Sequence, residues 1–286
     1  YSSALAADVA INGGLVMTGA PVFSSANAGA VTVNQGSVLL TGSRAGNYNL
    51  VWTAPAATIT KAPLSVTAND DAKFYSLADG AGYAGVRYSG FVGGETSAAL
   101  GGTLAITRDR RAITGSASAS TDPAATYANV LVPAGLTSSN YEITFNPGSY
   151  TIVPVGELLV RVQNISTTYG STPTYTVTAA GFMSDPTSNQ NYVVTDLLNP
   201  NRVTVTGAAV TVSNGSATVA QFNLGAVNPG AGSITSSSGN LIVGSYALGA
   251  SSVVESSPNF SNNIHIVGAY EVTPKSLTVT AGGLTK

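Results

Sequence analysis

The chain has 286 residues, of which only 8% are charged and none is cysteine, and its formal net charge is −2. This charge content is far below the roughly 25% of an average globular protein, and it argues against a nucleic-acid partner, which would need a basic face. The lack of cysteine excludes disulfides, thiolate metal sites and cysteine nucleophiles, and the sequence contains no apolar run of about 20 residues that would predict a membrane span.

Residues 1–60 are interpreted as the rear part of one β module. Pairs of alternating apolar residues predict short strands, and Asn12-Gly13-Gly14 predicts a hairpin. The predicted strand pairs are Val9 with Ile11, Leu15 with Met17, Val31 with Val33, and Val38 with Leu40.

A recurring joint organises the rest of the chain. It is predicted to form a strand, a turn, a second strand, a short proline-containing link and a third strand. In its middle copy Asn146-Pro147-Gly148 separates two runs that alternate between apolar and polar residues, so a tight turn is expected there. The copies read NYNLVWTAPAATITKAPLSVTA at 47–68, NYEITFNPGSYTIVPVGELLVRV at 140–162, and NFSNNIHIVGAYEVTPKSLTVTA at 259–281.

The spacing of these copies predicts whole domains in tandem. Leu64 and Leu158 are 94 residues apart, and Leu158 and Leu277 are 119 apart, whereas solenoid repeats recur every 20–50 residues. We expect an all-β chain of small modules, either sandwiches or β-grasp-like sheets, in an elongated, semi-rigid array with at most one short helix, near Glu95–Leu100. The predicted modules are 1–60, 61–154, a longer one at 155–274, and the start of another at 275–286.

Few residues suggest chemistry. Asp70, Asp71 and Asp79 are the densest group of carboxylates and the only candidates for a metal, namely Ca²⁺, but their spacing matches no calcium loop and a solvated turn is the alternative. Arg108, Arg110 and Arg111 suggest either an anionic polysaccharide site or, more commonly, a solvated turn or a charged edge strand. No other cofactor is expected.

The remaining candidates are interpreted as structural. His265 lies between two apolar strand residues and is predicted to face solvent, so no catalytic triad is expected. Trp52 shares a predicted face with Tyr48 and Leu50 and is assigned to the core, and Tyr75 and Tyr169, at equivalent places in two modules, are assigned to packing. No acid/base pair has convincing spacing, and we expect the chain not to be an enzyme.

Several segments resemble known repeats. They are similar to the MBG ("mostly beta, glycine-rich") and YDG-type repeats of large bacterial surface proteins, including filamentous haemagglutinin-like adhesins. The resemblance implies a mainly β, extracellular region at the bacterial cell surface, an outer-membrane secretion partner as in two-partner secretion, and no catalytic residues. The segments are KAPLSVTANDDAKFY at 61–75, YSGFVGGET at 88–96, LTSSNYEITFNPGSYTI at 136–152 and, for the YDG type, 24–50.

Two functions follow as hypotheses. The first is a stalk segment of an adhesin, which projects a binding region for cell adhesion or biofilm formation. The second is a module that binds a glycan, an exopolysaccharide or a host surface, with its site in 155–274, because the interior at 187–258 is long, polar and unlike the preceding module. Neither hypothesis involves nucleic acid or membrane insertion.

Overall fold

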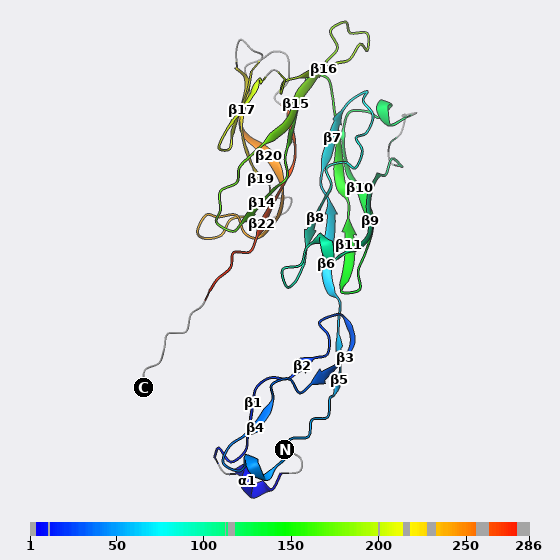
Figure 1. Ribbon diagram of the computed structural model, residues 1–286. Helices are drawn as coiled ribbons and strands as arrows, with labels where there is room; N and C mark the ends of the chain where they lie inside the picture. Colours follow the sequence, from blue (N-terminus) through cyan, green and yellow to red (C-terminus); the bar gives the residue numbers. More distant parts are fainter. Residues whose placement is uncertain are drawn as a thin grey trace. The chain divides into compact units, whose positions relative to one another are not determined.

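The computed structural model describes residues 4–10, 12–111, 113, 118–199, 201–213, 218–227, 233–255 and 263–278. Within them the chain consists mainly of β-strands, with one five-residue α-helix and three short 3-10 helices (Figure 1). The prediction of an all-β fold is therefore confirmed. The contacts divide the chain into two compact units, residues 1–63 with 137–142, and residues 64–136 with 143–286. No helix in the described ranges is long and apolar enough to cross a membrane.

The first unit contains two small sheets, with strand orders β1-β4 and β2-β3-β5. Before Pro63, the buried apolar side chains among the described residues are Leu15, Val31 and Val38, so its core is small. The elements are α1 (Ala6–Ala10), β1 (Val16–Thr18), β2 (Val22–Phe23), β3 (Gly29–Asn34), β4 (Leu39–Thr41), the 3-10 helix η1 (Ala45–Asn47) and β5 (Ala56–Ile59).

Three local predictions for the first unit are wrong. Val9 lies in helix α1 rather than in a strand, and its predicted partner Ile11 is outside the described residues. Asn12-Gly13-Gly14 forms a turn, but β1 pairs with the distant β4, so this turn closes no hairpin. Residues 48–55 form no strand. Trp52 Nε1 donates to the Val33 carbonyl and the Val33 N–H donates to the Pro55 carbonyl, both at 2.9 Å, but Pro55 has no N–H with which to extend a ladder.

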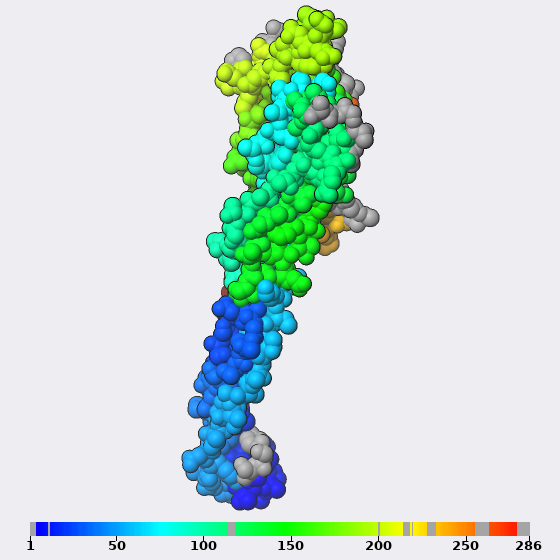
Figure 2. Space-filling view, turned by 90° about the vertical axis from the view of Figure 1, so that its right-hand side faces the viewer, coloured from blue at the N-terminus to red at the C-terminus, as the bar shows by residue number. Residues whose placement is uncertain are grey.

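The upstream module, which we define as β6–β12, belongs to the second unit except for residues 62, 63 and 137–142. It consists of two sheets with strand orders β11-β6-β8 and β7-β12-β10-β9 (Figure 1). The face formed by β9 and β10 is the green surface turned toward the reader in Figure 2. The elements are β6 (Ala62–Ala68), β7 (Asp71–Phe74), β8 (Val86–Ser89), η2 (Ser97–Ala99), β9 (Gly101–Arg108), η3 (Ala119–Thr121), β10 (Thr126–Thr137), β11 (Tyr141–Asn146) and β12 (Gly148–Val153).

The downstream module, β13–β22, also has two sheets, with orders β16-β15-β13-β21 and β14-β22-β20-β19-β18-β17. The long interior at 187–258 supplies the antiparallel strands β17 to β20 of the larger sheet. The elements are β13 (Leu158–Val162), β14 (Ile165–Thr168), β15 (Val177–Ser184), β16 (Val193–Asp196), β17 (Val203–Thr206), β18 (Ala209–Ser213), β19 (Thr218–Val227), β20 (Gly244–Glu255), β21 (Ile264–Val267) and β22 (Ala269–Thr273).

In both modules the chain passes from one sheet to the other at two equivalent points. In the upstream module β6 and β7 belong to different sheets, and so do β11 and β12; in the downstream module the same holds for β13 and β14, and for β21 and β22. β12 pairs with β7 in parallel, just as β13 pairs with β21 and β14 with β22. Each module is therefore a two-sheet structure whose sheets exchange strands at one corner, which favours the sandwich over the β-grasp alternative.

The crossing points are held by equivalent residues. The Asp70 side chain accepts a hydrogen bond from the Ser149 N–H at 2.7 Å, and the Asn164 side chain accepts one from the Ala269 N–H at 3.0 Å. These bonds satisfy backbone donors at the points where the ladders are interrupted. The glycine immediately before each donor allows close approach, because a Cβ atom on Gly148 would lie 2.6 Å from the Ala68 carbonyl oxygen.

This crossing corrects the prediction for the joint. Asn146-Pro147-Gly148 is not a tight turn between paired strands; it is the point where the chain passes from one sheet to the other. Proline and glycine mark both kinds of break, so the sequence alone did not separate them. The short helix expected near Glu95–Leu100 is present as η2, a 3-10 helix. Residues 274–278 form no strand, and the rest of the predicted further module, 279–286, lies outside the described residues.

A shared apolar cluster joins the two modules within the second unit. Phe74 and Val153 of the upstream module pack with Leu159, Met183 and Val267 of the downstream module, and all of these side chains are buried. Arg161 on β13 forms an ion pair with Asp71 on β7 at 2.7 Å and also donates to the Ala72 carbonyl. The short link at 154–157 is therefore not the only connection between the modules.

Candidate functional site

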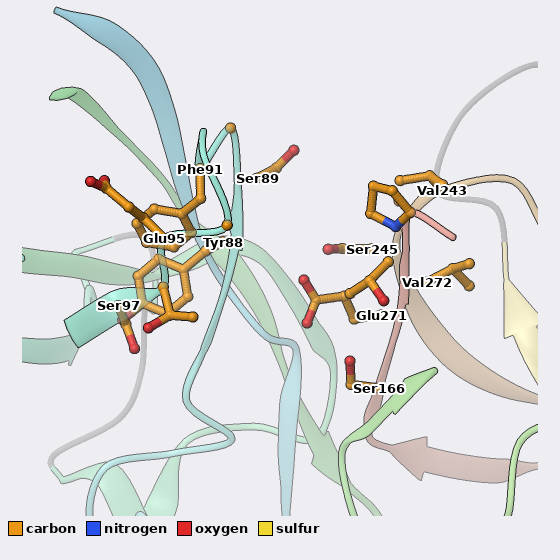
Figure 3. A pocket seen from close by; sticks show the side chains of 16 residues that line it. Tyr88, Ser89, Phe91, Glu95, Ser97, Ser166, Val243, Ser245, Glu271 and Val272 are labelled. Atoms are coloured by element: carbon orange, nitrogen blue, oxygen red, sulfur yellow. The ribbon is translucent and has the colours of Figure 1, made fainter. Parts of the chain in front are cut away.

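A cleft of about 680 Å³ lies between the two modules of the second unit (Figure 3). Its size is within the range of roughly 300–1,000 Å³ that is common for ligand sites. One wall comes from β8 and the loop after it, and carries Tyr88, Phe91 and Glu95. The opposite wall comes from β14, β20 and β22, and carries Ser166, Ser245 and Glu271 together with apolar and main-chain surface.

The upstream wall is built by the end of β8 and a glycine-rich loop. The rings of Tyr88 and Phe91 lie 5.5 Å apart and are tilted by 41°, so they form one aromatic surface, and both are half-buried. The loop then turns at Gly93 and Gly94, whose φ angles of 62° and 79° are rarely adopted by other residues. This turn leads to Glu95 at the rim. Burial raises the pKa of the Tyr88 hydroxyl, which therefore stays protonated near neutral pH.

The downstream wall follows from the alternation of β22. Tyr270 and Val272 point into the core, and Glu271 between them is exposed. In Figure 3 its carboxylate points across the gap toward Tyr88, whereas the Glu95 carboxylate points away from the gap. The cleft thus places one carboxylate opposite an aromatic surface. Hydroxyl groups from Ser166 and Ser245 lie on the same wall as Glu271.

A smaller cavity of about 160 Å³ adjoins this cleft and shares Tyr88, Ser166, Ser245 and Glu271 with it. Arg87 lines this cavity and donates through Nη1 to the Asn69 side chain at 3.2 Å and to the Ala68 carbonyl at 3.4 Å. Burial lowers the pKa of the guanidinium, which nonetheless remains charged at any physiological pH. The Arg87 guanidinium is thus held by Asn69 and Ala68 of its own module.

The upstream module also contains a buried network of charges, to which Asp79 belongs. Arg108 is almost fully buried; its Nε lies 2.6 Å from Asp79 Oδ2, and its Nη1 lies 2.6 Å from Asp122 Oδ2. Lys73 lies 3.0 Å from Asp79 Oδ1. The Arg108 guanidinium also lies over the Tyr150 ring, 4.9 Å from its centre. Because this network lies inside the sandwich and connects several strands and loops, it is part of the core of the upstream module.

The network shifts its own pKa values. Burial by itself would raise the pKa of Asp79, but the hydrogen bonds from Arg108 and Lys73 outweigh it and hold that pKa below its ordinary value. Burial would lower the pKa of Arg108, and the hydrogen bonds to Asp79 and Asp122 reverse this and raise it. Both partners are therefore charged throughout the physiological range, as an ion-paired core requires.

The structure separates the three carboxylates that were considered for Ca²⁺. Asp70 holds a crossing point, Asp71 pairs with Arg161, and Asp79 pairs with Arg108 and Lys73. Among the described residues no three or more His, Cys, Asp or Glu side chains come together as a group that could hold a metal ion. The sequence neighbours therefore do not form one calcium site, because each faces a different partner.

The arginine cluster is also divided. Arg108 is buried, Arg110 pairs with Asp122, and Arg111 pairs with Asp109 at 3.0 Å with its side chain 91% exposed. Only Arg111 thus matches the expected solvated turn. Because Arg108 is enclosed with two aspartates, the three arginines form no common surface for a polysaccharide.

The other singled-out residues have local partners. His265 Nε2 lies 2.6 Å from Glu157 Oε2, and the ring is half-buried rather than fully turned to solvent. Tyr169 bonds to the Ser236 hydroxyl at 2.8 Å, and the Tyr75 ring packs edge-on against Tyr192 at 5.4 Å. The packing role predicted for both tyrosines agrees with these contacts.

The sequence reasoning missed Tyr88 and Glu271 as site residues. Tyr88 begins the segment YSGFVGGET, which was used only as a sign of family resemblance, and Glu271 is the single charged residue within AYEV of the third joint. Alternation alone predicts that Glu271 points outward. Its position opposite Tyr88 depends on how two modules pack, which no local pattern encodes.

Comparison with protein families identifies part of the upstream module. Residues 64–151 match the family model described as MBG domain (YGX type), a segment that lies within the predicted module 61–154 and covers β6–β12 almost completely. An MBG-type repeat region is thus supported for this part of the chain. No curated protein and no solved structure matches the chain.

Proposed function

We propose that the chain is a structural segment of a bacterial cell-surface adhesin, which acts outside the cell and holds a binding region away from the surface for cell adhesion or biofilm formation. The observation that carries the proposal is the repetition of one crossing-strand architecture in two modules that share an apolar cluster. The MBG match at 64–151 supports it further. The proposal gives the chain no catalytic role and assigns its export to an outer-membrane secretion partner.

A spacer has to be stiff. It must keep a binding region at a fixed distance from the cell, and modules joined only by flexible links move too freely to do so. Here the buried side chains Phe74, Leu159 and Met183, together with the Arg161–Asp71 ion pair, connect the modules beside the link at 154–157. Bending at that link would expose apolar surface at a cost of roughly 25 cal/mol per Å².

Small-angle X-ray scattering of the whole chain tests the spacer function. A compact globule of 286 residues would have a radius of gyration of about 19 Å. The proposal predicts a clearly larger value and a distance distribution with a long tail. A value close to that of the compact globule, from a folded monomer, would contradict it.

A second candidate function is glycan or exopolysaccharide binding, and the cleft with Tyr88, Phe91 and Glu271 is the observation that favours it. Aromatic rings, hydroxyls and a carboxylate are groups that bind the faces and hydroxyls of sugars. Screening the 286-residue chain on a broad glycan and polysaccharide array tests it. Specific binding that is lost in a Tyr88→Ala variant with an unchanged melting temperature would support it, and a clean blank from folded protein would leave only the spacer function.

A further inference from the structure

The cleft combines two features that together recognise a cation. Tyr88 and Phe91 present a joint aromatic surface, and the Glu271 carboxylate points toward Tyr88 from the opposite wall. An ammonium group between them would be attracted by the negative faces of the rings and by the carboxylate at the same time. Glu95 also lines the cleft, but its carboxylate points away from the gap (Figure 3), so Glu271 supplies the facing negative charge.

The other charged group near the cleft does not cancel this preference. Arg87 lines only the smaller adjoining cavity, where it donates to Asn69 and to the Ala68 carbonyl. The described charged side chains that line the main cleft are both carboxylates, Glu95 and Glu271. A polyanion would therefore be repelled from the cleft, and a ligand with positive charge is favoured.

The shape and the remaining lining point to a sugar rather than a small ion. The cleft of about 680 Å³ is by itself large enough for more than one ring of a chain-like ligand. Its hydroxyl groups, among them Ser89, Ser97, Ser166 and Ser245, can donate to and accept from sugar hydroxyls. The aromatic surface suits the apolar face of a pyranose ring.

We propose that this cleft binds an amino-sugar oligosaccharide with free amino groups, with one ammonium group between the Tyr88 ring and the Glu271 carboxylate. This inference rests on the second candidate function and deepens it by naming the class of glycan. Tyr88 and Phe91 stack on a sugar ring, Glu271 pairs with the ammonium group, and the serine hydroxyls bind the sugar hydroxyls.

Two matched probes isolate the charge. Oligomers of β-linked glucosamine are compared by calorimetry with the same oligomers fully N-acetylated, which keep the rings and lose the positive charge. We expect the glucosamine form to bind roughly tenfold more tightly, with the difference shrinking as NaCl is raised from about 0.05 to about 0.5 M. Glu271→Gln should remove most of the difference, whereas Glu142→Gln, which changes an exposed carboxylate outside the cleft, should not.

The outcomes separate this inference from the function on which it rests. Equal binding of both probes, unchanged by Glu271→Gln, would overturn the role of charge but leave glycan binding in place. Binding of neither probe, together with a blank array, would overturn both. A lysine-rich peptide that binds as tightly as the glucosamine oligomer would show charge attraction without sugar recognition and would also overturn the inference. Melting temperatures of the variants control for folding.

Discussion

The two modules of the second unit have the same crossing strands around very different interiors. The upstream module encloses a small apolar cluster with Leu131 and Ile152, next to a network of charges centred on Arg108, Asp79 and Asp122. The downstream module encloses a large apolar cluster that includes Val160, Leu224 and Phe222. The shared elements are few and local, namely a glycine at the crossing point and an Asp or Asn side chain that bonds the next N–H. The two modules thus share the residues at their crossing points and differ in the side chains that fill their interiors.

Because the interiors differ, the two modules should lose stability in response to different kinds of substitution. An apolar core loses stability in proportion to the volume removed, whereas a buried ion network loses it when one partner leaves another uncompensated. Substitutions matched between the modules can therefore test the comparison.

The largest expected effect comes from Arg108→Leu. The change removes the cation that Asp79 and the fully buried Asp122 share, and leaves Asp122 with Arg110 and Asp79 with Lys73 as their remaining cations. We expect the free energy of unfolding to fall by about 3–5 kcal/mol, measured by urea denaturation. Arg111→Leu is the control, because that side chain is 91% exposed, and it should change stability by less than about 0.5 kcal/mol. Similar small effects for both variants would contradict the structural role of the network.

Leu224→Ala is the matching change in the downstream module. Leu224 is 3% exposed within the apolar cluster, so its truncation should lower the free energy of unfolding by about 3 kcal/mol. The loss should be the same at neutral and at acidic pH, because no titratable carboxylate belongs to the cluster. A strongly pH-dependent loss would show that the two interiors do not differ as described.

Asp79→Asn probes the pH dependence of the upstream module. The pKa of Asp79 is lowered in the folded state, so its charge adds stability above the unfolded pKa of about 3.9, and this stability is lost as the pH falls through the folded value. We expect a cost of about 2 kcal/mol at pH 7, since the lost bonds involve charged groups. The difference between wild type and variant should shrink toward zero well below pH 3.9. A difference independent of pH would contradict the ion-paired assignment.

Gly268→Ala tests the crossing itself. An added Cβ atom would lie 3.0 Å from both the Val162 carbonyl oxygen and a Leu248 methyl group, so we expect a loss of about 1–2 kcal/mol. Gly225→Ala in β19 of the downstream module is the control, because its Cβ would meet nothing within 4 Å, and it should be neutral or slightly stabilising. Equal effects of the two variants would mean that close approach is not what requires glycine at the crossing.

The smallest expected effect is at the bonds that hold the crossing points. Asp70→Ala and Asn164→Ala should each lower the free energy of unfolding by about 1 kcal/mol, because each leaves one backbone N–H without its acceptor. Asp70→Asn should be nearly neutral, since the downstream module has Asn at the equivalent place. If Asp70→Asn were as damaging as Asp70→Ala, the two positions would not be equivalent.

Period-two alternation predicted the strands well where one face is buried. It located β11, β12 and β13 around Tyr141, Tyr150 and Leu158, and β21 and β22 around Ile264 and Tyr270. It did not reveal that the chain changes sheets at Pro147, because a proline-glycine break has the same local signature in a turn and in a crossing. This is why these five strands were predicted correctly, whereas the turn predicted between β11 and β12 was wrong.

The candidate site was less accessible to sequence reasoning. Asp70, Asp71 and Asp79 are neighbours in sequence, but strand alternation and a loop direct them to three different partners. Tyr88 and Glu271 are far apart in sequence, and only the packing of two modules brings them to one cleft. Contacts of this kind depend on tertiary structure, and a single sequence contains no local pattern for them.

We expect the upstream and downstream modules to unfold as one cooperative unit, because Phe74, Leu159, Met183 and the Arg161–Asp71 pair hold them together. Hydrogen exchange at increasing urea concentration, resolved for peptides from β12 and from β20, tests it most directly. We predict that both peptides lose protection at the same urea concentration, with the same slope. Loss of protection in one module while the other stays folded would show two independent domains and contradict the claim.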